Sequence, residues 1–128
     1  MRLAFLHLLI SLQLLLLLGL SDAAAVEPGP LGRCYDGEKD YDCTSAQPYC
    51  LLTITLTLDN VYDPEADHEM APGSCTTSPV LEGCTKGPAD NMYYCYCDSR
   101  KDSFCNTKWV VQSKLINMAI ALYQKAHP

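Results

Sequence analysis

The chain has 128 residues and a formal net charge of −6, because 15 acidic side chains outnumber 9 basic ones. An acidic surface repels nucleic-acid phosphates and anionic lipid headgroups, so the charge excludes nucleic acid as an expected partner. The length suits one small domain, and eight cysteines in so short a chain favour stabilisation by disulfides rather than by a large apolar core.

The first 25 residues have the order of features that is typical of a secretory signal peptide. Arg2 gives a positive start, residues 3–20 are mostly apolar, and small residues follow up to Ala25. We expect cleavage after Ala25, with cleavage after Ala23 as the alternative, because the peptidase requires small side chains before the cut. The apolar length also leaves open an uncleaved membrane anchor. Residues 26–33 are rich in proline and glycine and form the predicted linker into the domain.

The cysteines all follow this segment. An even number of cysteines in an exported chain indicates disulfides, because the secretory pathway oxidises thiols. Metal binding is the competing interpretation, but zinc sites favour pairs spaced as C-x2-C, and this sequence has none. We therefore expect four disulfides, no metal and no cofactor, while the number of cysteines alone leaves the pairing open. The cysteines are Cys34, Cys43, Cys50, Cys75, Cys84, Cys95, Cys97 and Cys105.

The strongest secondary-structure signal lies in residues 51–58, where apolar residues alternate with threonines. A period of two is typical of a half-buried strand, and it places Ile54, Leu56 and Leu58 on one face. An acidic loop through residues 59–69 follows, and the chain then returns to Cys75. A strand, a long loop and a segment that returns toward Cys75 together predict a long hairpin.

Shorter elements lie on either side of this hairpin. Residues 34–42 are dense in charge and predict a small exposed loop. After the hairpin, turn residues at 86–91 lead into an aromatic strand at 92–96, which predicts a second hairpin between Cys84 and Cys95. A small charged loop, residues 97–105, ends the cysteine-rich part.

Residues 107–125 predict an amphipathic helix, because apolar residues recur at helical spacing from Val111 to Tyr123. Three interpretations of this tail remain open. It could be the signal for a lipid anchor, which the short apolar run at 118–123 matches poorly. It could contact a membrane or a partner through its apolar face. It could also pack against its own domain or be partly disordered.

Three loops of different length that start from a cysteine cluster resemble the three-finger fold. This is the fold of the lymphocyte-antigen-6 and urokinase-receptor domains and of the snake three-finger toxins. Residues 33–35 (Arg-Cys-Tyr) resemble the start of such a domain, and residues 43–50 resemble the cysteine pair that leads into the central finger. Residues 93–97 (Tyr-Tyr-Cys-Tyr-Cys) and 104–106 (Phe-Cys-Asn) resemble the closing motif.

The resemblance implies a small, disulfide-rich, mainly β domain of antiparallel hairpins that extend from a cysteine core. It covers residues 34–106, which leaves 1–25 as signal peptide, 26–33 as linker and 107–128 as a C-terminal amphipathic tail. It also implies the bridges Cys34–Cys50, Cys43–Cys75, Cys84–Cys95 and Cys97–Cys105. Asn106 is then expected to fix the core by hydrogen bonds to neighbouring backbone.

The sequence departs from the family pattern in three places, the first of which is a short finger one with eight residues between Cys34 and Cys43. Tyr96 separates two cysteines that are usually adjacent, and the extra cysteine pair that many lymphocyte-antigen-6 domains carry in finger one is absent. These departures leave the subfamily open.

The sequence offers little for catalysis, and we expect no enzyme activity. Only His68 and His127 follow the signal peptide to act as a base, and every cysteine is expected in a bridge. The carboxylates of residues 59–69 suggest calcium binding, but their spacing differs from an EF-hand loop and Pro64 restricts the chain. We interpret this stretch as a solvated hairpin tip.

The hairpin tip is the candidate partner-binding surface, because it mixes aromatic, charged and flexible apolar groups. The expected function is a secreted interaction module that binds or modulates a cell-surface receptor or another extracellular protein. A small hydrolase inhibitor and a lipid-anchored surface protein of the same fold are the alternatives. Membrane contact through residues 107–125 stays open. The predicted contact residues are Tyr62, Asp63, Glu65, Asp67, His68 and Met70.

Overall fold

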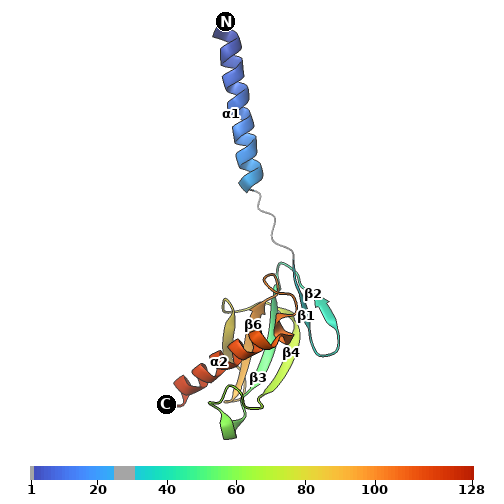
Figure 1. The fold of residues 1–128 in the computed structure, drawn as a ribbon, viewed down its shortest axis with the longest axis vertical. Helices are drawn as coiled ribbons and strands as arrows, with labels where there is room; N and C mark the ends of the chain where they lie inside the picture. Colours follow the sequence, from blue (N-terminus) through green and yellow to red (C-terminus); the bar gives the residue numbers. More distant parts are fainter. Residues whose placement is uncertain (1, 25–30) are drawn as a thin grey trace.

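The computed structural model describes residues 2–24 and 31–128 (Figure 1). Helix α1 (Arg2–Ala24) contacts no other described element. The predicted cleavage site after Ala25 and the predicted linker residues 26–30 lie outside the described residues. No helix in the described part of the chain is both long enough and apolar enough to cross a membrane.

Residues 31–128 form two antiparallel sheets and a C-terminal helix. The two-stranded sheet pairs β1 (Arg33–Tyr35) with β2 (Asp40–Asp42). The second sheet has the strand order β4-β3-β6-β5. Its strands are β3 (Tyr49–Thr55), β4 (Glu69–Thr76), β5 (Gly83–Lys86) and β6 (Met92–Asp98). The predicted small, mainly β, disulfide-rich class is therefore confirmed.

Strand β3 has the alternation that the sequence predicts. Leu52 and Ile54 are fully buried, and the intervening Thr53 and Thr55 are half-buried on the other face. Leu56 continues the buried face just beyond the strand. The period of two therefore identifies the core-facing residues of this strand correctly.

The predicted orientation of Leu58 is wrong. Leu58 begins the short 3-10 helix η1 (Leu58–Asn60) and is 62% exposed. The strand ends at Thr55 because its neighbour β6 begins opposite this residue, so the chain beyond has no strand to pair with. Asn91, in the turn before β6, completes the backbone bonding of Leu56 through two hydrogen bonds of 2.8 Å.

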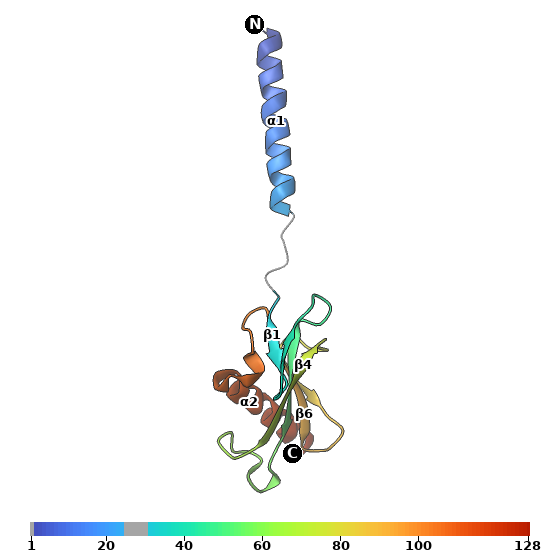
Figure 2. The same cartoon turned by 90° about the vertical axis from the view of Figure 1, so that its right-hand side faces the viewer.

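Helix α2 (Trp109–Ala126) lies on one face of the four-stranded sheet (Figure 2). The predicted helix is confirmed, and of the three interpretations of the tail the structure agrees with a helix packed against its own domain. Trp109 and Val110 at its start remain exposed. The core contains Leu115, Ile116, Ala119 and Ile120 from the helix and Leu52, Ile54 and Tyr93 from the sheet.

All eight cysteines are oxidised, and the predicted disulfide framework is confirmed. The bridges are Cys34–Cys50, Cys43–Cys75, Cys84–Cys95 and Cys97–Cys105. These are the pairs that the resemblance implies. The first two bridges touch, since the Sγ atoms of Cys34 and Cys43 lie 3.2 Å apart. Each bridge restricts the unfolded chain and adds about 2–4 kcal/mol of stability.

Asn106 is fully buried in the 3-10 helix η2 (Cys105–Thr107). Its Nδ2 donates to the backbone carbonyls of Tyr35, Leu51 and Gly73, each at 3.0 Å. Leu51 and Gly73 lie at a bulge in the β3–β4 register. One side-chain amide therefore holds β1, β3 and β4 together.

Replacing Asn106 with alanine should lower the free energy of unfolding by about 3 kcal/mol or more, because each buried carbonyl left without a partner costs about 1–3 kcal/mol. Asn106→Asp should be more destabilising, since it places a carboxylate against three carbonyl oxygens. Asn117→Ala, on the exposed side of α2, is the control and should change stability by less than about 0.5 kcal/mol. Denaturant unfolding measures all three. Equal losses at Asn106 and Asn117 would contradict the structural role of Asn106.

Candidate interaction surface

The tip of the β3–β4 hairpin, residues 56–68, carries most of the side chains that were predicted to contact a partner. Tyr62, Asp63, Glu65 and Asp67 are exposed there. The tip lies at the end of the hairpin opposite to the one where Cys50 of β3 faces Cys75 of β4 (Figure 1). The structure thus brings four of the six predicted residues together on one accessible loop.

His68 is buried, so it does not belong to the accessible contact surface that the sequence predicted. Its Nδ1 accepts the N–H of Thr57 at 2.9 Å. A backbone N–H can only donate, so the ring proton sits on Nε2, which donates to the carbonyl of Asp63 at 2.7 Å. The imidazole therefore ties both sides of the loop from within, and it is a structural residue.

Met70 also differs from its predicted role. It is half-buried in β4 and packs against the core cluster. Period-two alternation in β4 directs its side chain inward. The accessible part of the predicted surface is therefore Tyr62 and the acidic residues.

Further hydrogen bonds fix the backbone of the tip. Oδ1 of Asp63 accepts the N–H of Glu65 at 2.9 Å. The hydroxyl of Thr57 donates to the carbonyl of Asp67 at 2.8 Å. The carboxylate of Asp63 thus shapes the turn, while those of Glu65 and Asp67 project without a partner among the described residues.

Tyr62 connects the tip to helix α2. Its ring meets the ring of Tyr123 edge to face at a centroid separation of 6.1 Å, a favourable aromatic geometry. Tyr123 in turn stacks on His127 at 4.1 Å. The tip therefore rests against the C-terminal end of α2, and half of the Tyr62 side chain stays accessible, at 50% exposure.

His68→Ala should loosen the tip without unfolding the domain. Two hydrogen bonds of about 1 kcal/mol each are lost, so the amide of Thr57 should exchange with solvent about ten to a hundred times faster. Asn117→Ala, on the exposed side of α2 and without a contact to the tip, is the control and should leave this amide unchanged. Hydrogen exchange read by NMR measures both. An unchanged Thr57 amide in His68→Ala would contradict the bonding described above.

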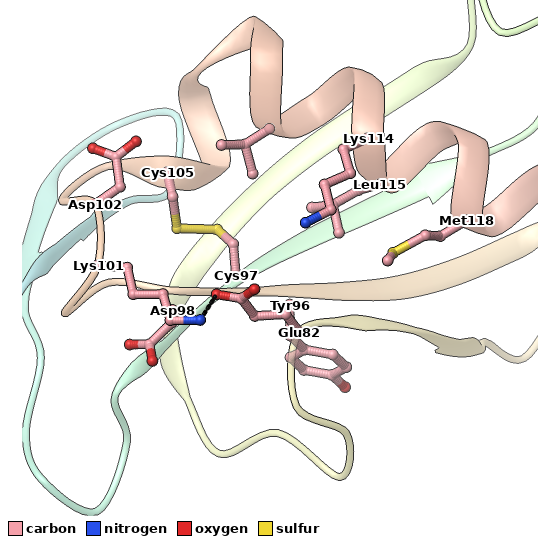
Figure 3. A pocket seen from close by; sticks show the side chains of 11 residues that line it. Glu82, Tyr96, Cys97, Asp98, Lys101, Asp102, Cys105, Lys114, Leu115 and Met118 are labelled. Carbon is pink, nitrogen blue, oxygen red and sulfur yellow. Dashed lines mark ion pairs between the residues drawn. A yellow bond between two sulfur atoms is a disulfide. The ribbon is translucent and has the colours of Figure 1, made fainter.

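A second hollowed surface, which the sequence did not predict, lies beside α2. It consists of two neighbouring hollows of about 200 and about 400 Å³, and both are lined by Glu82 and Met118. The smaller hollow lies between α2 and the end of β6 (Figure 3). We call the two hollows together the α2 groove.

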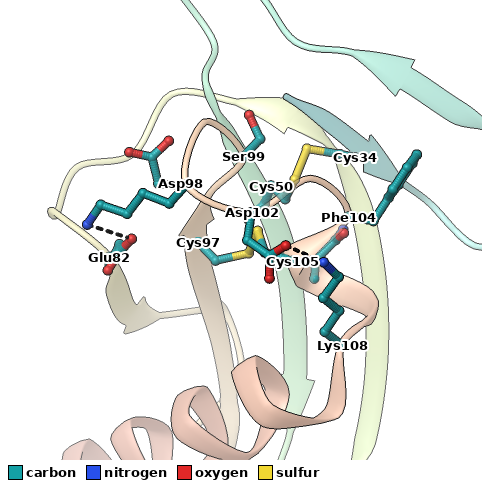
Figure 4. The surroundings of a disulfide bond; sticks show 12 residues. Cys34, Cys50, Glu82, Cys97, Asp98, Ser99, Asp102, Phe104, Cys105 and Lys108 are labelled. Carbon is teal, nitrogen blue, oxygen red and sulfur yellow. Dashed lines mark hydrogen bonds and ion pairs between the residues drawn. A yellow bond between two sulfur atoms is a disulfide. The ribbon is translucent and has the colours of Figure 1, made fainter. Parts of the chain in front are cut away.

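Ion pairs surround the Cys97–Cys105 bridge at the edge of this groove (Figure 4). Nζ of Lys101 lies 3.1 Å from Oε1 of Glu82. Lys108 pairs with Asp102. Glu82 and Asp102, which line the smaller hollow, are thus neutralised by Lys101 and Lys108, which come after β6 in the chain.

Asp98, the last residue of β6, has a buried carboxylate. Nε and Nη2 of Arg100 donate to its two oxygens at 2.9 Å, and the Arg100 N–H donates at 2.9 Å as well. The hydrogen bonds from the Arg100 side chain lower the pKa of Asp98 below its usual value, because they stabilise the charged form. Burial acts in the opposite direction and is outweighed.

This lowered pKa predicts a specific dependence of stability on pH. The ionised Asp98 carboxylate adds to the free energy of unfolding. This contribution is fully present above the pKa of Asp98 in the unfolded chain, about 4, and is lost as the pH falls through its pKa in the folded protein. Asp98→Asn should therefore lower Tm at neutral pH and flatten the fall of Tm below about pH 4. Asp67→Asn is the control: the Asp67 side chain has no partner among the described residues, so this change should alter the dependence of Tm on pH less. Thermal unfolding at a series of pH values measures this. Curves of Tm against pH that run parallel for wild type and Asp98→Asn would contradict the lowered pKa of Asp98.

The cysteine sulfurs lie close enough together to suggest metal ligation at two places, Cys34–Cys43–Cys50 and Cys50–Cys97–Cys105. Each of these sulfurs is half of a disulfide and offers no thiolate for a metal. The clusters therefore reflect how closely the bridges pack.

Compared with known proteins, the chain matches no protein-family model, no curated protein and no solved structure. The class that the structure defines is a small, mainly β protein with four disulfides and a C-terminal helix. Its function has to be inferred from its own surfaces.

The α2 groove had one signal in the sequence. Lys114, Met118, Ala121 and Lys125 recur at helical spacing and so share one side of α2. The opposite wall could not be found this way, because Glu82 belongs to a segment more than thirty residues earlier in the chain.

Proposed function

We propose that this protein is a secreted interaction module of the three-finger class, which binds a cell-surface receptor or another extracellular protein through the tip of its β3–β4 hairpin. Three successive antiparallel hairpins support the class. So do the disulfide pairing and the buried amide of Asn106 at the end of the cysteine-rich part. The protein acts by binding rather than by catalysis.

Secretion is supported by two independent features of the chain. The first 25 residues have the charge, apolar stretch and small residues of a signal peptide. Four disulfides with no free cysteine among the described residues suit an oxidising compartment.

The observation that carries the proposal is that the tip is exposed and yet fixed from within. His68 and Asp63 bond across the loop, and Tyr62 rests on Tyr123. A loop that is already ordered loses little conformational entropy on binding, which favours affinity. The tip thus presents a preorganised acidic surface with one accessible aromatic ring.

The charge of the tip indicates the kind of partner surface it suits. Glu65 and Asp67 project freely, and Asp59 is exposed nearby. Acidic groups at the rim of an interface steer a basic partner and raise the association rate, an effect that salt weakens. We therefore expect a receptor surface rich in lysine or arginine.

The test combines secretion with a binding screen. The full chain is expressed in a eukaryotic cell, and the released protein is screened against displayed receptor ectodomains at low and physiological salt. For each ectodomain that binds, Glu65→Lys and the double variant Glu65→Lys/Asp67→Lys should weaken binding about tenfold or more, mainly through the association rate. Asp63 is left intact because it holds the turn.

Glu38→Lys provides a control with the same charge change on the β1–β2 hairpin, where Glu38 is exposed. It should leave binding nearly unchanged. If Glu38→Lys weakens binding as much as Glu65→Lys does, only the net charge matters and the tip is not the contact surface. Retention of the protein inside the cell would refute secretion.

A further inference from the structure

The α2 groove is mostly apolar and is open to solvent. Ala121 and Leu122 of the helix line the larger hollow. Val80 and Cys84, which is bonded to Cys95, line it as well. Leu81, next to Val80, is 90% exposed. The larger hollow, at about 400 Å³, has the size, the apolar walls and the few polar groups that are typical of small-ligand sites.

The charges of the groove differ from those of the rest of the protein. Lys114 lines the smaller hollow and Lys125 lines the larger one. Neither has an acidic or aromatic partner among the described residues, whereas every other lysine and arginine of residues 31–128 has one. In a chain with a net charge of −6, the groove therefore collects the cations that remain unpaired.

Three acidic side chains line the groove, and each is already in an ion pair, two of them as Asp98–Arg100 and Asp102–Lys108. Glu82, which lines both hollows, pairs with Lys101. Its φ of 54° lies in the left-handed region, which a residue with a side chain adopts at a cost of about 1–2 kcal/mol. Such backbone is typical of functional sites. Because all three carboxylates of the groove are paired, their repulsion of an anion that approaches Lys114 is largely offset.

The spacing of the two free lysines sets the length of the site. They are eleven positions apart on α2, which corresponds to about 16 Å along the helix axis. Met118 lies between them and faces both hollows. The groove thus offers a cation at a narrow end, an apolar trough beside it, and a second cation at the far end.

We propose that the α2 groove binds a single-chain amphiphile with a carboxylate head, that is, a long-chain fatty acid. The carboxylate pairs with Lys114 in the smaller hollow. The hydrocarbon chain passes Met118 and lies in the larger hollow along Ala121 and Leu122. The methylene stem of Lys125 covers the end of the chain while its ammonium group stays in water.

Fatty acid binding does not depend on the proposed receptor contact, because none of these residues lies in the hairpin tip. An acidic amphipathic peptide is the other occupant that the charges permit. The two hollows favour a thin flexible chain, since the smaller one, at about 200 Å³, is too small to enclose one turn of a peptide helix with its side chains.

The first test measures binding of oleate to the delipidated protein, in the form that a eukaryotic cell produces from the full chain. Lys114→Gln should weaken oleate binding about tenfold, because a charge-assisted hydrogen bond is lost. Lys125→Gln should weaken it only about twofold, as expected for an exposed charge. Lys39→Gln, on the β1–β2 hairpin, is the matched control and should have no effect.

A second ligand separates the head from the chain. Oleyl alcohol has the same hydrocarbon chain without the charge, so it should bind more weakly than oleate and be insensitive to Lys114→Gln. Leu122→Glu introduces an acid into the larger hollow and should weaken both ligands. Near-ultraviolet circular dichroism of each variant shows that its fold is retained.

NMR of isotope-labelled methionine methyl groups locates the site independently of affinity. Oleate should shift the methyl resonance of Met118 and leave those of Met70 and Met92 in place. An unmoved Met118 signal at saturating oleate would overturn the proposal, and so would equal oleate affinity of wild type and Lys114→Gln. Binding of an acidic amphipathic peptide without binding of oleate would overturn it in favour of a protein partner.

Discussion

The amide of Asn106 is the interaction on which the rest of the structure depends. It bonds three backbone carbonyls from three strands at a point where the Cys34–Cys50 and Cys97–Cys105 bridges also meet. A domain of this size has little apolar core to hold its hairpins in register, so covalent and polar constraints carry much of that task. The same residue also binds the first turn of α2, because its carbonyl accepts a hydrogen bond from the side chain of Gln112.

Helix α2 then transmits this constraint to both candidate surfaces. One of its faces closes the core through Ile116 and its neighbours, and its C-terminal end supports the hairpin tip through Tyr123. Its outer flank forms one wall of the α2 groove. A helix that was mobile or anchored elsewhere would leave the tip unsupported and the groove without a wall.

What the sequence could predict was local, and what it missed depended on distant partners. Alternation identified the buried face of β3, because strand geometry alone dictates it. The same rule failed at Leu58, where the end of the ladder depends on where β6 begins. His68 looked like a surface residue in an acidic loop, and only the folded loop shows that its ring bonds Thr57 and Asp63. Helical spacing predicted α2 but not the sheet that covers its apolar face.

The distribution of charge joins the two proposed surfaces into one physical account. The protein is acidic, and it projects unpaired carboxylates at the hairpin tip while it retains unpaired ammonium groups beside α2. The backbone of the tip is held by the side chains of His68 and Tyr62. Because the tip is held, both sets of charges stay available to ligands of opposite sign. A basic protein surface and a fatty acid carboxylate are therefore complementary to different ends of the same helix-supported domain, and neither has to displace an internal ion pair in order to bind.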